Sequence, residues 1–302
     1  MAMSIMEQFK SDCMIRNISG LEIYMLYAQE FLDFLAKRDK KVTEVTREDL
    51  KSYLANLRER GLKQSSINRV FTCLSGFYAF LVDEDLASSN PIIPFRRRYL
   101  KTYKDDNGTE SRQITDVKQA SMLVNSILDS KDKAIVTLLF KTGMRRGELC
   151  RLDFNDIDLD NMNLKLKPTA KRSNRILFFD GETANVLRIW LKVRGERYKG
   201  EVALFPSRQS GRLSPTQVEN LVKKHATRVG LHNPNSASLE DRFTPHCCRH
   251  WFTTHLIRAG MPRDFVKELR GDARRETIDI YDHIDKKELK ESYLAHIPQL
   301  GI

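Results

Sequence analysis

The feature that most constrains the fold is a break in the helical pattern between residues 87 and 113. This stretch, ASSNPIIPFRRRYLKTYKDDNGTESRQ, has prolines, Gly108 and polar residues in place of the apolar spacing on either side. Proline and glycine interrupt regular structure, so such stretches commonly separate folding units. A chain of 302 residues is also long enough to form two domains. We therefore predict an N-terminal domain at residues 1–92, a basic linker at 93–112 and a second domain at 113–302.

The N-terminal domain has the apolar spacing of amphipathic helices. Apolar residues recur every three or four positions in Ser19–Arg38, in a helix expected from Thr46 to Gly61, and in a third helix starting near Ser65. Thr46 is a suitable N-cap, and Gly61 is a suitable stop. Helices joined by short loops predict a small all-helical module.

The second domain has a mixed pattern. DIDLDNMNLKLKP and RILFFD alternate apolar and polar residues and predict two strands joined by the turn TAKRSN, and VALFPS predicts a further short strand. Proline after a serine or threonine marks helix starts at Ser214 and Thr244. Further helices are expected at Asp116–Leu128, Lys131–Lys141 and Ala184–Val193. We therefore predict an α+β fold, mainly α with a small β-sheet.

The composition narrows the class of protein. Lys and Arg number 51 against 40 Asp and Glu, and this net charge of +11 favours a polyanionic partner such as nucleic acid. No apolar run approaches the length of a membrane span, and the first residues lack the apolar stretch of a signal peptide. Five cysteines, two of them adjacent, do not predict a disulfide framework. We expect a cytoplasmic protein with reduced thiols and no membrane partner.

The stretch TPHCCRHWFTTHL, from Thr244 to Leu256, first suggests a metal site. On a helix, however, His246, Arg249 and His250 share one face while the two cysteines turn away from it. A zinc site needs four converging ligands, and no second ligand pair is visible in the sequence. We interpret the cysteines as core residues and predict no metal.

Two further motifs accompany this stretch. They are TGMRRGEL, which contains Arg145 and Glu148, and IDIYDHI near the C-terminus, which contains Tyr281. In this order the motifs resemble the tyrosine recombinase, or phage integrase, family. Its signature is Arg, Lys, His-x-x-Arg, a His or Trp, and then Tyr. The resemblance covers nearly the whole chain and implies a helical, SAM-like core-binding domain followed by a catalytic domain of the DNA breaking-rejoining type.

The resemblance assigns roles to individual residues. Arg145 matches the first arginine, and Glu148 matches the acid that follows it. His246 and Arg249 match the His-x-x-Arg pair, and Tyr281 matches the nucleophile. Lys171, in the turn between the two predicted strands, matches the hairpin lysine, although Lys167 and Arg172 are close alternatives. Tyr293 is the rival nucleophile, and we prefer Tyr281 for its spacing from RGD.

One position departs from the family pattern. Where the family has His or Trp within LGH, this chain reads RGD and places Asp272. A carboxylate beside a phosphate opposes its negative charge. Either Asp272 points away, to orient Arg145 or Arg249, or its role has moved to another residue. His283 and Arg274 are candidates for that substitute.

The chemistry suits these residue types. Two guanidiniums can grip a phosphate bidentately and favour a phenolate, and lysine and histidine can transfer protons. The resemblance implies a covalent 3′-phosphotyrosine intermediate that conserves bond energy, so that neither metal, ATP nor another cofactor is needed. It also implies that the partner is double-stranded DNA with a specific site. On this DNA the protein would form a homotetramer, and the free chains would be either monomers or already associated.

The sequence leaves several alternatives open. We expect DNA recombination or DNA integration, either by the integrase of a mobile element or by a chromosome-maintenance recombinase. A type IB topoisomerase-like enzyme and a catalytically inactive DNA-binding protein are the competing hypotheses. The linker residues Arg96, Arg97, Arg98 and Lys101 form either a solvated tether or a DNA phosphate contact. The C-terminal tail docks either on its own domain or, as the resemblance suggests, on a neighbouring protomer.

Overall fold

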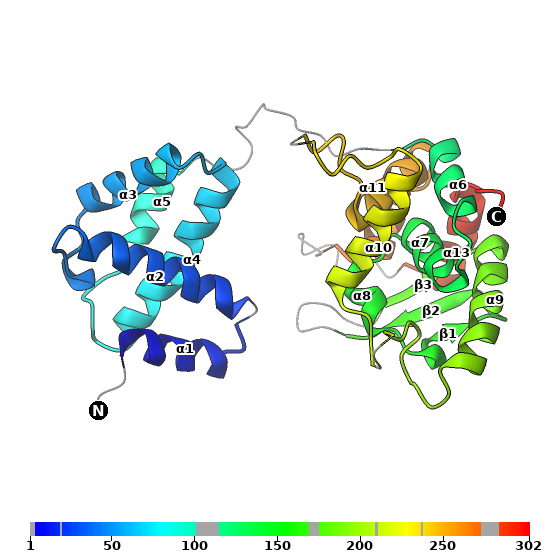
Figure 1. Cartoon of the computed structure of the whole chain (residues 1–302), viewed down its shortest axis with the longest axis horizontal. Helices are drawn as coiled ribbons and strands as arrows, with labels where there is room; N and C mark the ends of the chain where they lie inside the picture. The colour runs from blue at the N-terminus through cyan, green and yellow to red at the C-terminus, as the bar shows by residue number, and fades with distance from the viewer. Residues whose placement is uncertain are drawn as a thin grey trace. The chain divides into compact units, whose positions relative to one another are not determined.

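The computed structural model describes residues 4–18, 20–100, 115–168, 175–208, 211–236, 238–272 and 284–302. The chain divides into two compact units, Met1–Thr109 and Glu110–Ile302 (Figure 1). The first is helical, and the second combines helices with one small sheet, which confirms the predicted α+β class. No helix in the ranges given is long and apolar enough to cross a membrane.

Helices alone build the described part of the first unit. They are α1 (Ile5–Ile15), α2 (Leu21–Ala36), the 3-10 turn η1 (Val42–Glu44), α3 (Arg47–Glu59), α4 (Gln64–Asp83) and α5 (Ile92–Tyr99). Thr46 caps α3 as predicted, because its hydroxyl accepts from the backbone N–H of Asp49 at 3.3 Å. α1 was not predicted, and it starts with a similar capping box formed by Ser4 and Glu7.

The start of the predicted linker is a helix instead. Residues 92–99 form α5, which packs against α4. Pro91 and Pro94 do not prevent this, because the first turn of a helix has no intrahelical acceptors for its N–H groups. Phe95 is 3% exposed and stacks on Phe71 with ring centroids 5.3 Å apart. The aromatic anchor therefore places this segment in the first unit, and residues 101–112 of the predicted linker lie outside the described ranges.

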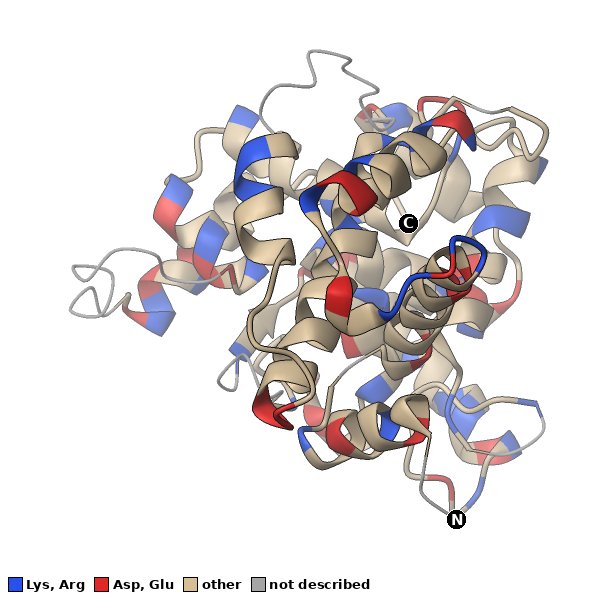
Figure 2. Cartoon of the chain, turned by 90° about the vertical axis from the view of Figure 1, so that its left-hand side faces the viewer, with Lys and Arg blue, Asp and Glu red and all other residues tan. Residues whose placement is uncertain are grey.

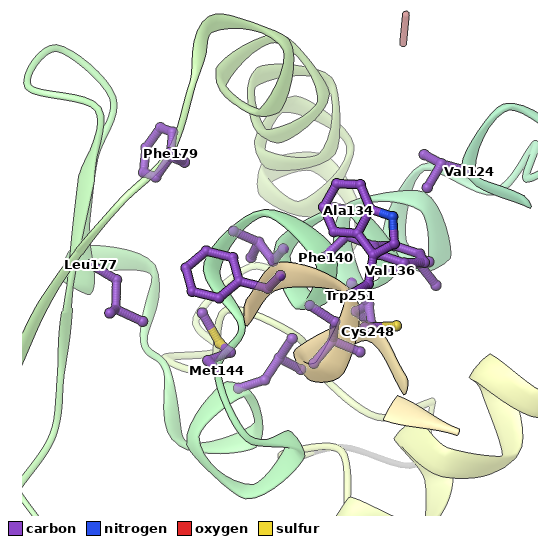
Figure 3. Packing of buried hydrophobic residues seen from close by; sticks show 14 of the residues in the cluster. Val124, Ala134, Val136, Phe140, Met144, Leu177, Phe179, Cys248 and Trp251 are labelled. Carbon is purple, nitrogen blue, oxygen red and sulfur yellow. The ribbon is translucent and has the colours of Figure 1, made fainter. Parts of the chain in front are cut away.

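The second unit is built around a buried helix. α7 (Ser130–Thr142) is buried on all sides from Ala134 onward, as expected for a helix with other elements around it. It packs against α9 (Gly181–Arg197) and α11 (Pro245–Arg258). Phe140 of α7 meets Trp251 of α11 edge to face, with ring centroids 5.2 Å apart (Figure 3). The remaining helices are α6 (Val117–Asn125), α8 (Arg146–Arg151), α10 (Pro215–Arg228), α12 (Arg263–Arg270), α13 (Lys286–His296) and the 3-10 turn η3 (Phe154–Asp156).

The sheet has three antiparallel strands in the order β1-β2-β3. They are β1 (Ile157–Asp158), β2 (Asn163–Leu166) and β3 (Arg175–Phe178), with Leu164 opposite Leu177. The first predicted strand is therefore two strands. The Asp158 carboxylate accepts from the backbone N–H of Asn161 at 2.8 Å and folds the chain into a turn there.

The short strand predicted at VALFPS is wrong. Only isolated bridges involve this segment, at Ala203 and Pro206. Side chains of α9 take its backbone acceptors: Trp190 donates to the carbonyl of Leu204 at 3.1 Å, and Arg194 donates to that of Ala203 at 3.0 Å. Carbonyls used in this way are not available to a neighbouring strand.

The C-terminal tail docks on its own unit in the single chain. Tyr293 of α13 is fully buried, and its hydroxyl donates to the carbonyl of Lys141 at 2.9 Å. The Lys141 ammonium, also fully buried, lies 2.5 Å from Asp180 and 2.8 Å from Glu182 and donates to the carbonyl of Pro298 at 2.8 Å. A buried cation with three oxygen partners therefore connects α7 and α9 to the tail.

Candidate active site

Arg145 lies in a sharp turn between α7 and α8. α7 ends at Gly143, whose φ of +59° favours glycine, and a β-carbon there would lie 2.4 Å from the ring of Phe252. Two residues later Arg145 takes the N-cap position of α8 in extended conformation. Its side chain is 38% exposed, so the turn carries an arginine from the buried end of α7 to the surface.

Arg249 projects from α11, which starts at Thr244–Pro245 as predicted. Its side chain is only 5% exposed, and Nη1 donates to the carbonyl of Gly143 at 2.6 Å. Burial, together with the cations Arg145 and Arg270, lowers the pKa of Arg249 to about 10. The guanidinium is still charged at neutral pH, and a backbone carbonyl at the end of α7 fixes its direction.

The two arginines meet at the end of α12. The carbonyl of Arg270 accepts from Arg249 Nη2 at 2.8 Å and from Arg145 Nη1 at 3.3 Å. The last carbonyls of a helix lack intrahelical donors and lie at the negative end of its dipole, so they attract cations. Two guanidiniums that are distant in sequence therefore share one acceptor atom.

Asp272 follows directly and points toward the pair. Its Oδ1 lies 3.4 Å from Arg249 Nη2 and 3.9 Å from Arg145 Nη2, and Oδ2 lies 3.2 Å from Arg270 Nε. Asp272 therefore contacts both arginines, as in the alternative in which it orients Arg145 or Arg249, although it points toward the pair and not away from it. Gly271 allows the turn because it has a φ of +60°.

Glu148 supports the turn of Arg145. Its Oε2 accepts from the backbone N–H of Arg145 at 2.7 Å, which is the reciprocal half of a capping box, and its Oε1 lies 3.5 Å from Arg145 Nη1. The side chain is 13% exposed. Glu148 is thus close to Arg145, the arginine that it follows in the motif.

Arg175 was missed by the sequence analysis. It starts β3, is 7% exposed, and donates to Glu148 Oε1 at 2.6 Å and to the carbonyl of Leu269 at 2.9 Å. Burial lowers the pKa of Arg175, and Glu148 partly offsets this. A β-carbon on Gly271 would lie 2.2 Å from Nη1 of Arg175. The only signal for Arg175 in the sequence is an arginine at the inward-facing first position of an apolar strand, RILF.

His246 is exposed in the first turn of α11, three residues before Arg249 and thus on the same face. Its ring lies edge to face with that of His250, with centroids 4.7 Å apart. The two cysteines between them are buried in the core, and burial raises the pKa of Cys248 well above its usual value. No group of three metal-ligating side chains occurs within the described ranges.

Comparison with known proteins identifies the family of this chain. The family model described as Phage integrase family matches residues 110–288, and that described as Phage integrase, N-terminal SAM-like domain matches residues 21–85. The chain belongs to the phage integrase family. It is a tyrosine recombinase with an N-terminal SAM-like domain and a catalytic domain, an enzyme of DNA cleavage and strand transfer.

Individual relatives cover most of this integrase. Tyrosine recombinase XerC of Alcanivorax borkumensis is 31% identical over 258 residues, which are 82% of this chain and 78% of the relative. Tyrosine recombinase XerC of Bacillus pumilus is 27% identical, with 94% and 92% covered. The crystal structure of XerH site-specific recombinase bound to difH substrate, a pre-cleavage complex, shares the fold with a TM-score of 0.69, covering 97% of this chain and 84% of that one at 19% identity.

Several predicted site and DNA-binding residues lie outside the described ranges. They are Lys171, Tyr281, His283, Arg274 and Lys101. Two of their alternatives are described. Lys167 pairs with Asp153, and Tyr293 has its hydroxyl buried on a backbone carbonyl, where burial raises its pKa well above the usual value. A hydroxyl in that state is a poor nucleophile, which removes Tyr293 as a rival.

Three of the predicted DNA contacts of the linker, Arg96, Arg97 and Arg98, lie at the end of α5. Arg96 donates to the hydroxyl of Thr72 at 3.0 Å, and the guanidinium of Arg98 lies 5.8 Å from the ring centre of Tyr99. Arg97 is exposed on the same turn. In Figure 2, Lys and Arg alternate with Asp and Glu over many helices, so the excess positive charge does not gather on a single helix in that view.

Proposed function

We propose that this protein is a site-specific recombinase that cleaves and rejoins double-stranded DNA through a covalent 3′-phosphotyrosine at Tyr281, without metal or ATP. The observation that supports this most is the shared acceptor, the carbonyl of Arg270, which brings Arg145 and Arg249 together. Two fixed guanidiniums side by side suit the two non-bridging oxygens of a phosphodiester.

The arginine pair supplies charge stabilisation in this proposal. Arg249 is anchored by two carbonyls and nearly buried, so it needs little reorganisation when negative charge develops on the phosphate. Arg145 is more exposed and has room to follow the DNA backbone. Removal of one preorganised donor of this kind typically lowers the rate by about 10² to 10³.

Proton transfer falls to the remaining signature residues. The Tyr281 hydroxyl attacks phosphorus and loses its proton, and exposed His246 beside Arg249 is the acceptor or a hydrogen-bond donor to the phosphate. Lys171 protonates the departing 5′ oxygen. The phosphotyrosyl ester keeps the energy of the broken bond, so a second 5′ hydroxyl can attack it and rejoin the strand.

In this proposal DNA is the partner, and four copies of the chain assemble on it. The structural neighbour in a pre-cleavage complex is bound to its difH substrate. Basic residues of this chain, Arg96, Arg97, Arg98 and Lys101, contribute phosphate contacts. Recombination serves either a mobile element or chromosome maintenance.

Covalent capture tests the proposal. Genomic fragments that carry random nicks are incubated with the protein. A nick beside the cleaved phosphate lets the departing strand leave and so traps the adduct, and sequencing of the covalently bound fragments identifies the site. We expect an adduct that is lost in Tyr281→Phe. Tyr293→Phe is the matched control, because it also removes one tyrosine hydroxyl but a buried one, and its adduct should persist. Adduct formation by Tyr281→Phe, or DNA binding with no adduct at any site, would overturn the assignment.

A further inference from the structure

The arginine pair of the site already has an anion beside it. Asp272 Oδ1 lies 3.4 Å from Arg249 and 3.9 Å from Arg145, and the side chain is 32% exposed. Glu148 is the other carboxylate near the pair, but it is bound by Arg175 at 2.6 Å and by the backbone N–H of Arg145 at 2.7 Å. Asp272 is therefore the carboxylate on the accessible side of the two guanidiniums.

Orientation of the arginines does not depend on Asp272. Arg249 is held by the carbonyls of Gly143 and Arg270 at 2.6 and 2.8 Å, and Arg145 shares the second carbonyl. All three hydrogen bonds to these carbonyls are shorter than the distance from either arginine to Asp272. Carbonyls direct a guanidinium but do not neutralise it, and two adjacent cations repel each other. The contribution specific to Asp272 is therefore its negative charge.

Asp272 also has another cation to retain when it leaves the pair. Its Oδ2 lies 3.2 Å from Arg270 Nε, and both side chains are about one third exposed. The carboxylate can thus turn from the pair toward Arg270 and solvent. The contacts with the pair are long for charge-assisted hydrogen bonds, which normally measure about 2.7–2.9 Å. This is a replaceable ion pair and not a fixed clamp.

We propose that Asp272 is a built-in counter-ion that occupies the oxyanion position of the arginine pair in the free protein and is displaced by a DNA phosphate. The DNA half of this inference rests on the proposed function, whereas the anion half does not. Asp272 thereby reduces the repulsion between the two arginines in the free protein, and it competes with the backbone of any DNA that enters. Asp272 acts on binding in this account and takes no proton in the reaction.

Inorganic sulfate tests the anion half without DNA. The melting temperature of the whole chain is measured in sodium sulfate and in sodium chloride at equal ionic strength, for wild type, Asp272→Asn, Asp272→Ala and Asp264→Asn. Asp264 is the matched control, because it lies on α12, the helix that Asp272 follows, is 63% exposed and pairs with Lys267, so its loss changes the net charge equally. We expect both Asp272 variants to have a lower melting temperature than wild type in chloride, and we expect sulfate to restore it. Wild type and Asp264→Asn should show no such difference between sulfate and chloride.

Binding to a 30-base-pair duplex of random sequence tests the DNA half. Asp272→Asn should bind about fivefold more tightly than wild type, as expected when one repulsion near 4 Å is removed. The affinity of Asp264→Asn for the duplex should rise less than about twofold, because the charge of Asp264 is exposed and screened. Equal responses of the Asp272 and Asp264 variants to sulfate, or weaker DNA binding by Asp272→Asn, would refute the counter-ion. If wild type binds no duplex while the sulfate contrast holds, the proposed function fails and the counter-ion stands.

Discussion

The two units of this integrase are stabilised in different ways. Among the described residues, every buried charged side chain belongs to the second unit. These residues are Lys141, Arg175, Asp180, Arg194 and Arg249. The core of the first unit is apolar and rich in aromatic rings, such as Phe31, Tyr53 and Phe77. Buried ions are costly unless each finds partners, so they are retained where position matters more than stability.

The difference shows what each core does. The aromatic core of the first unit keeps helices together and tolerates some repacking. In the second unit the buried charges hold specific parts in place. Lys141 fixes the tail, and Arg175 fixes the turn after α12. Arg249 occupies a position in the site that is lined by backbone acceptors. The catalytic unit should therefore be sensitive to the loss of single charges, and the first unit should not.

Lys141→Ala should have the largest effect. It leaves Asp180 buried at 4% exposure without its cation, and removal of one member of a buried pair costs about 3–5 kcal/mol. Both tryptophans, Trp190 and Trp251, lie in the second unit, so urea unfolding followed by their fluorescence reports on that unit. The double variant Lys141→Met/Asp180→Asn is the control, because it removes both charges and should recover part of the loss. A loss below about 1 kcal/mol in Lys141→Ala would contradict this view of the buried network.

Arg249→Ala should come next, and its main effect is on chemistry. Loss of one preorganised donor predicts a fall of about 10² to 10³ in the rate of covalent adduct formation, or about 2.7–4 kcal/mol. Arg258→Ala is the matched control, since it removes an exposed arginine from the last turn of the same helix. Similar rates for the two variants would argue against a role of Arg249 at the phosphate.

Arg175→Lys should have a smaller and more specific effect. Lysine keeps the charge but loses the planar fork that reaches both Glu148 and the carbonyl of Leu269. As a positioning residue, Arg175 should affect cleavage more than binding. We expect adduct formation to slow about tenfold, or about 1.4 kcal/mol in the barrier, with DNA affinity within about twofold of wild type.

Two further measurements identify the cause of that effect. Arg188→Lys is the control, because Arg188 is exposed on α9 and bonds only to Asn185 among the interactions described. Arg175→Ala should lose more activity than Arg175→Lys if charge and reach both matter. Equal losses in affinity and in cleavage rate would indicate a general structural role instead.

Local sequence signals predicted much of the fold. Helix starts with a cap or a proline, such as Thr46, Ser214 and Thr244, were placed correctly, because a cap depends on neighbouring residues only. The structures of α5 and of the segment 202–207 were not predicted correctly, because they depend on partners that are distant in the sequence. Phe95 finds Phe71, and the carbonyl of Leu204 accepts from the indole of Trp190.

The residues of the site also divide into those that local motifs predicted and those that depend on tertiary contacts. Motif spacing indicated Arg145, Glu148, His246 and Arg249. The structure brings Arg145, Glu148 and Arg249 together at the end of α7, and His246 lies one turn before Arg249 on α11. Motif spacing did not indicate Arg175 or the direction of Asp272. Their positions depend on the end of α12 lying against β3, a tertiary contact with no local signature. The catalytic roles of all five signature residues stay predictions: Arg145, Lys171, His246, Arg249 and Tyr281.

Lys51→Ala should have the smallest effect. Lys51 pairs with Glu48 at 3.0 Å on the surface of α3, and its ammonium lies 5.9 Å from the ring of Tyr99. Exposed ion pairs and cation-π contacts contribute about 0.2–1 kcal/mol each, and salt screens the ion pair. We expect the free energy of unfolding, followed by far-ultraviolet circular dichroism in urea, to fall by less than about 1 kcal/mol and by less still at high salt. A loss as large as that of Lys141→Ala would mean that charge stabilises both units alike, because the two variants remove the same group from opposite environments.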